Sequence, residues 1–169
     1  MNSQHRPKVI VGVARRQSDV VVTTAIDLAR HFGADLVCAS VNEGGHMVGE
    51  SADGSVTSMS FNPDLVDEVE ETFNGDLKKN LDRILDGAGV EWSVRALAGD
   101  PAHAISHLAD TIDATMIVVG TREESMRGNL HEFFNGSVAV HLAHNQHRPV
   151  VVVPLAPVPF GHALAWDEG

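Results

Sequence analysis

Residues 8–13 (KVIVGV) and residues 115–120 (TMIVVG) decide the fold class of this chain. Both are short runs of mainly β-branched residues, and neither shows the alternation of polar and apolar residues that marks a half-exposed strand. Such uniformly apolar runs are typical of parallel strands that are buried on both faces. We therefore expect the two segments to be strands that lie side by side at the centre of an open sheet.

Strand-like and helix-like segments alternate along the rest of the chain, which predicts a parallel sheet with crossover helices. Trp92, Val94 and Ala96 alternate with polar residues, so residues 92–96 are expected at an edge of the sheet. Further strands are predicted at residues 35–41 and 149–153. Helices are predicted from Ser18 or Asp19 to Phe32, from Pro63 to Gly87 with an interruption at Gly75, from Pro101 to Ile112, and from Gly136 to Ala143.

Two segments lack such a pattern. Residues 42–61 are rich in Gly and Ser and are long for a loop in a compact domain, so we expect a loop that either moves or covers part of the molecule. Residues 155–169 carry Pro and Gly and are predicted to be an irregular tail. The chain is thus interpreted as one α/β domain, residues 1–154, followed by that tail.

Composition argues against several classes of protein. The formal net charge of −11 disfavours duplex nucleic acid and anionic membranes as partners, because both attract a positive surface. No apolar stretch is long enough to span a bilayer, and the N-terminus lacks a signal-peptide pattern, so a cytoplasmic location is expected. Cys38 is the single cysteine, which excludes a disulfide within one chain, and it is predicted to be a core residue.

The histidines do not form a recognisable catalytic or metal-binding motif. His141 and His144 are spaced so that they share a helix face, His147 lies near the end of that helix, and His103 and His107 form another helical pair, but no HExxH-type arrangement surrounds them. We expect these side chains to be solvated surface groups, and we expect neither a resident metal nor catalytic residues.

The carboxyl ends of the two central strands are the expected ligand site, because ligands of open parallel sheets bind where the winding direction reverses. These ends are Val13-Ala14 and Gly120, and the start of the last helix at Gly136-Ser137 would close the site. Helix N-termini attract anions and glycine permits close approach, so the pattern favours a phosphate-bearing ligand. The sequence lacks the dinucleotide motif GxGxxG, the P-loop motif GxxxxGK[ST] and the paired acids of a phospho-receiver domain.

Five segments resemble the universal stress protein family: residues 9–13 (VIVGV), 99–101 (GDP), 117–122 (IVVGTR), 136–138 (GSV) and 148–153 (RPVVVV). They occur in the family's order and span most of residues 8–154. The resemblance implies a five-stranded parallel sheet in the order 3-2-1-4-5 with helices on both faces. It also implies a homodimer formed through the last strand, Val150 to Val153. In one branch of the family, ATP is held by a G-x-x-G-(nine residues)-G-[S/T] motif.

Carried onto this sequence, that motif is only partly present. Gly120 matches its first glycine, and Gly136 and Ser137 match its last two residues. Glu123 replaces the second glycine, and the loop is three residues longer than the motif allows. An alternative interpretation is that Gly120 merely ends a strand and Gly136-Ser137 merely starts a helix.

Other residues near the loop also bear on nucleotide binding. Val41 matches a position that commonly packs on adenine, whereas Ala14 stands where ATP-binding members usually carry an acidic residue. Arg122 and Arg127 could hold phosphate oxygens through charge-assisted hydrogen bonds, and Gly128 could replace the missing glycine. The candidate nucleotide-binding residues are therefore Val13, Ala14, Val41, Gly120, Arg122, Arg127, Gly128, Gly136 and Ser137.

Two functions remain open on the sequence. The first is a non-catalytic stress-response module that binds ATP or another adenine nucleotide at the carboxyl ends of the first and fourth strands. The second is a family member that has lost nucleotide binding and acts through dimerisation and protein contacts. A slow ATPase is a third alternative, although no general base or metal-binding pair of carboxylates is evident.

Overall fold

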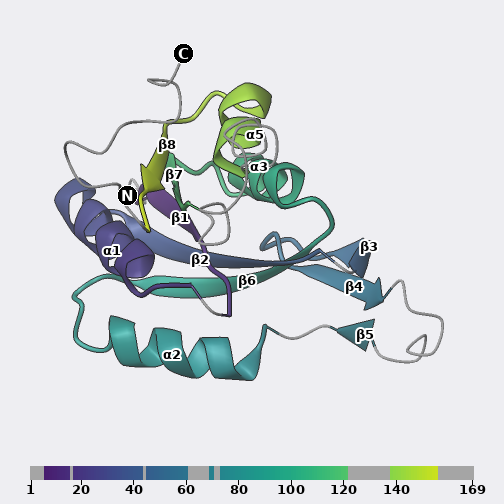
Figure 1. Ribbon diagram of the computed structural model, residues 1–169, viewed down its shortest axis with the longest axis horizontal. Helices are drawn as coiled ribbons and strands as arrows, with labels where there is room; N and C mark the ends of the chain where they lie inside the picture. Colours follow the sequence, from purple (N-terminus) through teal and green to yellow (C-terminus); the bar gives the residue numbers. More distant parts are fainter. Residues whose placement is uncertain are drawn as a thin grey trace, which may run out of the picture.

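The computed structural model describes residues 6–15, 17–43, 45–60, 69–70, 73–121 and 138–155. Its main sheet has five strands in the spatial order β6-β2-β1-β7-β8, and neighbouring strands are parallel (Figure 1). Counted in chain order within this sheet, the order is 3-2-1-4-5, so the predicted fold is confirmed. The strands are β1 (Lys8–Gly12), β2 (Asp35–Asn42), β6 (Trp92–Ala98), β7 (Met116–Gly120) and β8 (Val150–Val153).

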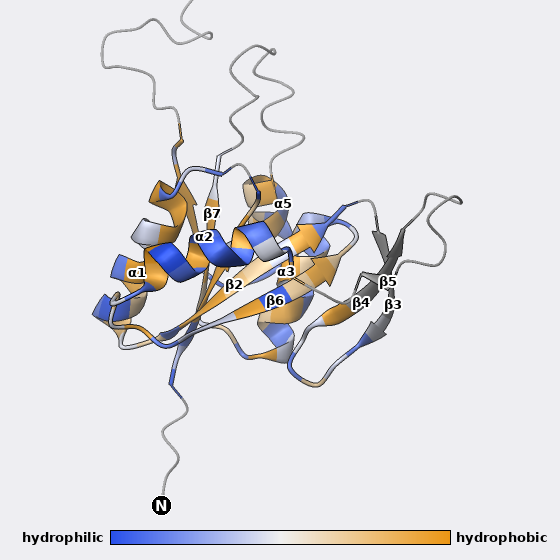
Figure 2. Cartoon of the chain, turned by 90° about the horizontal axis from the view of Figure 1, so that it is seen from below, coloured by the Kyte–Doolittle hydropathy of each residue, from blue (hydrophilic) through white to orange (hydrophobic). Residues whose placement is uncertain are grey.

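Helices cover both faces of this sheet (Figure 1). They are α1 (Val20–Phe32) and α2 (Gly75–Leu85) on one face, and α3 (Pro101–Thr111) and α5 (Val138–Asn145) on the other. Because side chains alternate across a strand, Val9 and Val11 of β1 pack with α1 and α2, whereas Ile10 packs with α3 and α5. Figure 2 shows mainly hydrophobic strands and a largely hydrophilic outer face of α2. The sheet is therefore the shared wall of two hydrophobic cores.

Caps define two helix ends. The side chain of Asp100 accepts a hydrogen bond from the backbone N–H of His103 at 2.8 Å, and Pro101 is the first residue of α3. Gly33 ends α1 in the left-handed conformation, with φ 60°. These ends fix the lengths of the connections between helices and strands.

Asp19 occupies the cap position of α1 without capping it. Its carboxylate instead accepts hydrogen bonds from Arg83 at 2.7 Å and from Asn80 at 3.2 Å, both on α2. These bonds, that of Arg83 above all, hold the pKa of Asp19 below its usual value. Asp19 thus joins the two helices that cover one face of the sheet.

The segment that we expected to be a loop, residues 42–61, instead forms most of a second sheet, so that prediction was wrong. In it β3 (Gly45–Glu50), β4 (Val56–Ser60) and β5 (Val69–Glu70) pair antiparallel in that order. β4 also contacts β6 at the edge of the main sheet. Backbone pairing and this contact stabilise strands whose Gly and Ser content alone disfavours them.

Helix α2 begins later than predicted. The sequence placed its start at Pro63, which lies outside the described residues, but Val69 belongs to β5 and the helix begins at Gly75. The helix begins there because Asn74 is its N-cap: the Asn74 side chain accepts a hydrogen bond from the backbone N–H of Leu77 at 3.0 Å. The sequence prediction relied on the apolar periodicity and did not identify this cap. Gly75, expected to interrupt the helix, is its first residue.

The turn between β3 and β4 packs against the main domain. Gly54 lies in this turn with φ +83° and is buried beside Leu108 of α3. Arg95 of β6 donates from Nε to the carbonyl oxygen of Asp53 at 2.6 Å. The second sheet is therefore fixed to both α3 and β6 at this end.

The predicted surface position of these histidines is confirmed. His103 and His107 of α3, His141 and His144 of α5, and His147, two residues beyond α5, are all exposed. His107 Nε2 lies 2.9 Å from a carboxylate oxygen of Glu50 in β3. Among the residues that the structure describes, no group of three or more His, Cys, Asp or Glu side chains could hold a metal ion.

Cys38 is a core residue of β2, as predicted, with 0% of its surface exposed. Burial raises the pKa of its thiol to about 12, because a thiolate would lose its hydration there. Near neutral pH the thiol is therefore protonated and inert. In the described part of the chain, no helix is long and apolar enough to cross a membrane.

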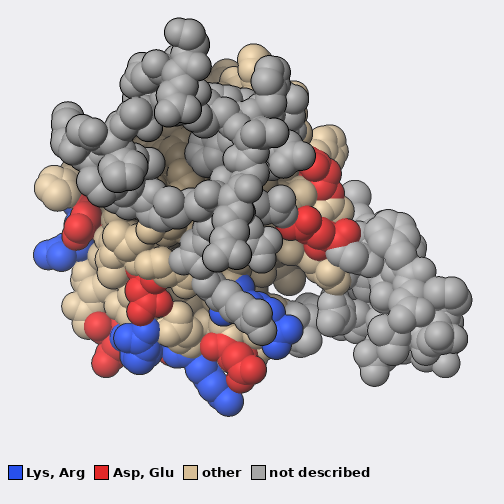
Figure 3. Space-filling view, viewed as in Figure 1, with Lys and Arg blue, Asp and Glu red and all other residues tan. Residues whose placement is uncertain are grey.

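On the face seen in Figure 3, basic side chains lie mostly beside acidic ones in the lower part of the view, whereas some acidic side chains on the right have no basic neighbour in view. Arg83 Nη2 is 2.7 Å from Asp19, and Lys78 Nζ is 2.7 Å from Asp82. Exposed pairs of this kind contribute about 0–1 kcal/mol each. On this face the described basic residues do not gather into a patch.

Candidate ligand-binding site

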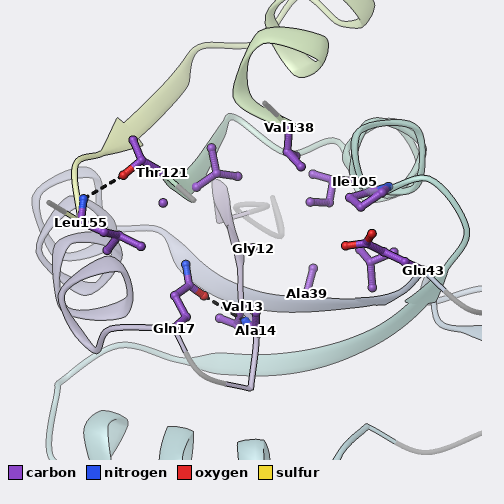
Figure 4. Close-up of a pocket in the computed structure, with 14 residues that line it drawn as sticks. Gly12, Val13, Ala14, Gln17, Ala39, Glu43, Ile105, Thr121, Val138 and Leu155 are labelled. Atoms are coloured by element: carbon purple, nitrogen blue, oxygen red, sulfur yellow. Dashed lines mark hydrogen bonds between the residues drawn. The ribbon is translucent and has the colours of Figure 1, made fainter. Parts of the chain in front are cut away.

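A cavity of about 390 Å³ opens at the carboxyl edge of the main sheet (Figure 4). Its lining comes from the ends of β1, β2 and β7, from the first turns of α3 and α5, and from the residue that follows β8 by two positions. The lining residues are Gly12, Val13, Ala14, Gln17, Ala39, Val41, Glu43, Pro101, Ile105, Val119, Gly120, Thr121, Val138 and Leu155. The cavity thus lies where the sequence placed a ligand.

Two of the lining glycines have little room for a side chain. A Cβ on Gly12 would lie 3.3 Å from Val119 Cγ1. A Cβ on Gly120 would lie 2.8 Å from Val21 Cγ2 and 3.2 Å from Leu155 Cδ1, closer than carbon atoms normally approach. Gly120 is therefore required by the packing of α1 and of Leu155, in addition to any role toward a ligand.

Gln17 closes the loop that follows β1. Its Oε1 accepts a hydrogen bond from the backbone N–H of Ala14 at 2.9 Å, and its own backbone N–H donates to the carbonyl oxygen of Ala14 at 3.2 Å. Figure 4 shows the amide nitrogen of Gln17 on the cavity side of this bond. The loop therefore presents a carboxamide donor to the cavity beside the short side chain of Ala14.

Leu155 is held at the rim of the cavity by Thr121. Its backbone N–H donates to the Thr121 hydroxyl oxygen at 2.9 Å, and the Thr121 N–H donates to the carbonyl oxygen of Val153 at 3.0 Å. These bonds continue the pairing of β7 and β8 beyond the strands. The residue after Pro154 consequently forms one wall of the cavity.

Glu43 carries a charge into the cavity from the end of β2. Ala39 and Val41 line it, because alternate residues of a strand point to the same side, and Glu43 lines it from the turn directly after β2. Figure 4 shows the carboxylate of Glu43 facing the cavity near Ile105. Glu43 is the one charged side chain among the lining residues that the structure describes.

A second cavity, of about 290 Å³, adjoins the first toward α2. It shares Val13, Ala14 and Val41 with the first cavity and is also lined by Arg15 and Asn74. Val13, Ala14 and Val41 therefore lie between two cavities. The first is mainly apolar and includes the acidic residue Glu43, and the second includes the basic residue Arg15.

A comparison with family models matches residues 5–154 to the universal stress protein family. The chain belongs to this family. Among solved structures it is similar to a universal stress protein in complex with cAMP, at 20% identity over 88% of this chain and 96% of the other, with a TM-score of 0.59. No match is found among curated proteins.

Two further universal stress proteins have similar structures. One, from Archaeoglobus fulgidus and in complex with dAMP, is 20% identical over 87% of this chain and 97% of the other, with a TM-score of 0.54. The other, from Arabidopsis thaliana and with AMP bound, is 14% identical over 88% and 90% of the two chains, with a TM-score of 0.53. At these identities the likeness establishes the shared fold.

The structure brings together four of the residues that the sequence assigned to the site of this universal stress protein. Val13, Ala14, Val41 and Gly120 all line the first cavity. The other five lie outside the described residues, and their assignment stays a prediction: Arg122, Arg127, Gly128, Gly136 and Ser137.

Of the fourteen residues that line this universal stress protein's cavity, ten were not assigned to the site from the sequence, and three of these bear most on ligand binding. Glu43 could have been found, because it directly follows the carboxyl end of β2, where ligands of parallel sheets bind. Gln17 had a weaker signal, a polar residue three positions after the strand-end loop begins. Leu155 had none, because it was assigned to an irregular tail. Of that tail, Leu155 is the described part, so the division at residue 154 stays a prediction.

Proposed function

We propose that this universal stress protein is a cytosolic, non-catalytic module that binds an adenine nucleotide in the first cavity. The observation that carries the proposal is the cavity itself, which is formed by the carboxyl ends of β1, β2 and β7. These are the strand ends where the family resemblance places the nucleotide. Three similar universal stress proteins carry cAMP, dAMP or AMP.

The lining of the cavity suits a planar base joined to a polar group. The side chains of Ala39, Val41, Ile105 and Val138 give it an apolar part. Gly120 and Thr121 give it a part bounded by backbone, and the chain continues from there into residues 122–137, which carry the predicted phosphate-binding residues. A small number of polar groups in a mainly apolar hollow is typical of cofactor sites.

Binding without chemistry is the simpler proposal for these residues. Among the described lining residues the ionisable group is Glu43, and the hydroxyl of Thr121 accepts a hydrogen bond from the Leu155 N–H. A hydrolase needs a nucleophile or water next to a positioned base. The described lining does not offer such a pair.

Calorimetric titration of nucleotide-free protein with AMP and ATP tests the proposal. We expect saturable heat from both at micromolar concentrations. A Val41→Trp variant should lose it, because an indole at this position fills the cavity from β2, while its thermal unfolding stays cooperative. Absence of heat from the wild-type protein at high micromolar ligand would favour the alternative, a family member that acts through protein contacts alone.

We also propose a homodimer through β8. This strand is at the edge of the main sheet, and its Val152 is 44% exposed. An apolar edge strand tends to pair with another edge, because its outward backbone groups are unpaired within the sheet.

Light scattering should therefore give twice the chain mass of 18.1 kDa at micromolar concentration. A Val152→Lys variant should be monomeric, because two charged edges repel. Val20→Lys is the matched control, since Val20 is a similarly exposed valine on α1, at 42%. A monomeric wild-type protein contradicts this proposal.

A further inference from the structure

The two ends of the first cavity differ in charge. Figure 4 shows Thr121, Leu155 and Gln17 on one side of the cavity, and Glu43 with Ile105 on the other. The first side offers a carboxamide and backbone groups, and the second offers a carboxylate next to apolar side chains. A ligand with an anionic end and an apolar end can therefore bind in one favourable orientation.

Electrostatics decide that orientation. Two like charges repel each other, and water screens this repulsion less inside a cavity than at an open surface. A phosphate beside Glu43 would meet this repulsion, whereas a phosphate near Gly120 would not. The phosphate therefore belongs at the Gly120 end, and the base belongs at the Glu43 end.

An ionised carboxylate only accepts hydrogen bonds. An adenine base presents one exocyclic amine with two N–H donors, and a hydrogen bond to a charged acceptor contributes more than one to a neutral acceptor. Resting on the proposed function, we propose that Glu43 is the specificity-determining residue of this site and accepts a hydrogen bond from the exocyclic amine of the adenine base.

The residue at position 14, in the loop after β1, explains why Glu43, next to the end of β2, would recognise the adenine amine. Ala14 stands where ATP-binding members usually carry an acid, and its backbone N–H already donates to Gln17. Its methyl group cannot accept a hydrogen bond. Glu43 lines the same cavity from the neighbouring strand and supplies the missing carboxylate.

Adenosine and purine riboside separate this role from general binding, because purine riboside is the same nucleoside without the exocyclic amine. For the wild-type protein we expect adenosine to bind about tenfold more tightly than purine riboside, the size of one hydrogen bond to a charged group. In Glu43→Ala the two affinities should agree within about twofold. Glu43→Gln keeps a carbonyl acceptor without the charge and should fall between them.

Glu91→Ala is the matched control, because it removes the same charge from an exposed residue next to the amino end of β6. Its ratio of affinities should equal that of the wild type. An unchanged ratio in Glu43→Ala overturns the inference and leaves nucleotide binding intact. Failure of the wild-type protein to bind either nucleoside or AMP overturns the proposed function and the inference together. Thermal unfolding of each variant checks that the fold is retained.

Discussion

Replacing Leu108 by alanine should lower the free energy of unfolding by about 2–5 kcal/mol. Leu108 lies on α3 and is 1% exposed, in the core formed with β1, β7 and α5. Leu108 also packs against the β3–β4 turn, where a Cβ added to Gly54 would lie 2.5 Å from Leu108 Cδ1. The substitution removes apolar contacts on both sides of the helix and leaves a cavity that the packed sheet cannot fill.

Urea denaturation monitored by circular dichroism measures this loss. The matched control is His103→Ala on the same helix, because His103 is exposed and its side chain is remote from that core. The control should change stability by less than about 0.5 kcal/mol. A loss below about 1 kcal/mol for Leu108→Ala would mean that α3 and the turn repack around the shorter side chain.

The main sheet was predictable because its signals are local. Uniformly apolar runs mark β1 and β7, alternation marks the edge strand β6, and the Asp100-Pro101 pair marks the start of α3. Each signal acts through the residue's own backbone or its immediate neighbours. Long-range contacts then stabilise the same secondary structure that the local sequence favours.

The second sheet was not predictable in the same way. The strands β3 and β4 consist largely of small and polar residues, and their stability depends on partners far along the chain. The pairing of Val69 with Met59 overrode an apolar period that favours a helix. Here tertiary contacts, and the cap at Asn74, decide which of two locally acceptable structures forms.

The residues of the candidate site also differ in whether a local sequence signal predicts them. Gly120 and Val41 were predictable from their positions at strand ends. Gln17 and Leu155 enter the cavity through hydrogen bonds to Ala14 and Thr121, and no sequence period encodes such bonds. Glu43 directly follows the end of β2, so its position was predictable, whereas the family pattern places the acidic residue in the loop after β1.

Replacing Gly54 by alanine should lower the free energy of unfolding by an amount comparable to the loss in Leu108→Ala. Two effects contribute. The left-handed backbone, with φ +83°, costs a residue with a Cβ about 1–2 kcal/mol. The new Cβ would also lie 2.5 Å from Leu108 Cδ1, and relieving such overpacking in a buried place costs about 1–3 kcal/mol more.

Gly89→Ala isolates the first effect, because Gly89 has φ +72° with nothing within 4 Å of its added Cβ. It should cost only the backbone term of about 1–2 kcal/mol. The second effect is isolated by introducing Gly54→Ala into Leu108→Ala, where the truncated side chain leaves room for the new methyl group. There its cost should fall to that of Gly89→Ala, so the two substitutions should couple by about 1–3 kcal/mol. Strict additivity of their urea-denaturation free energies would contradict the overpacking, because the cost of Gly54→Ala would then not depend on the Leu108 side chain.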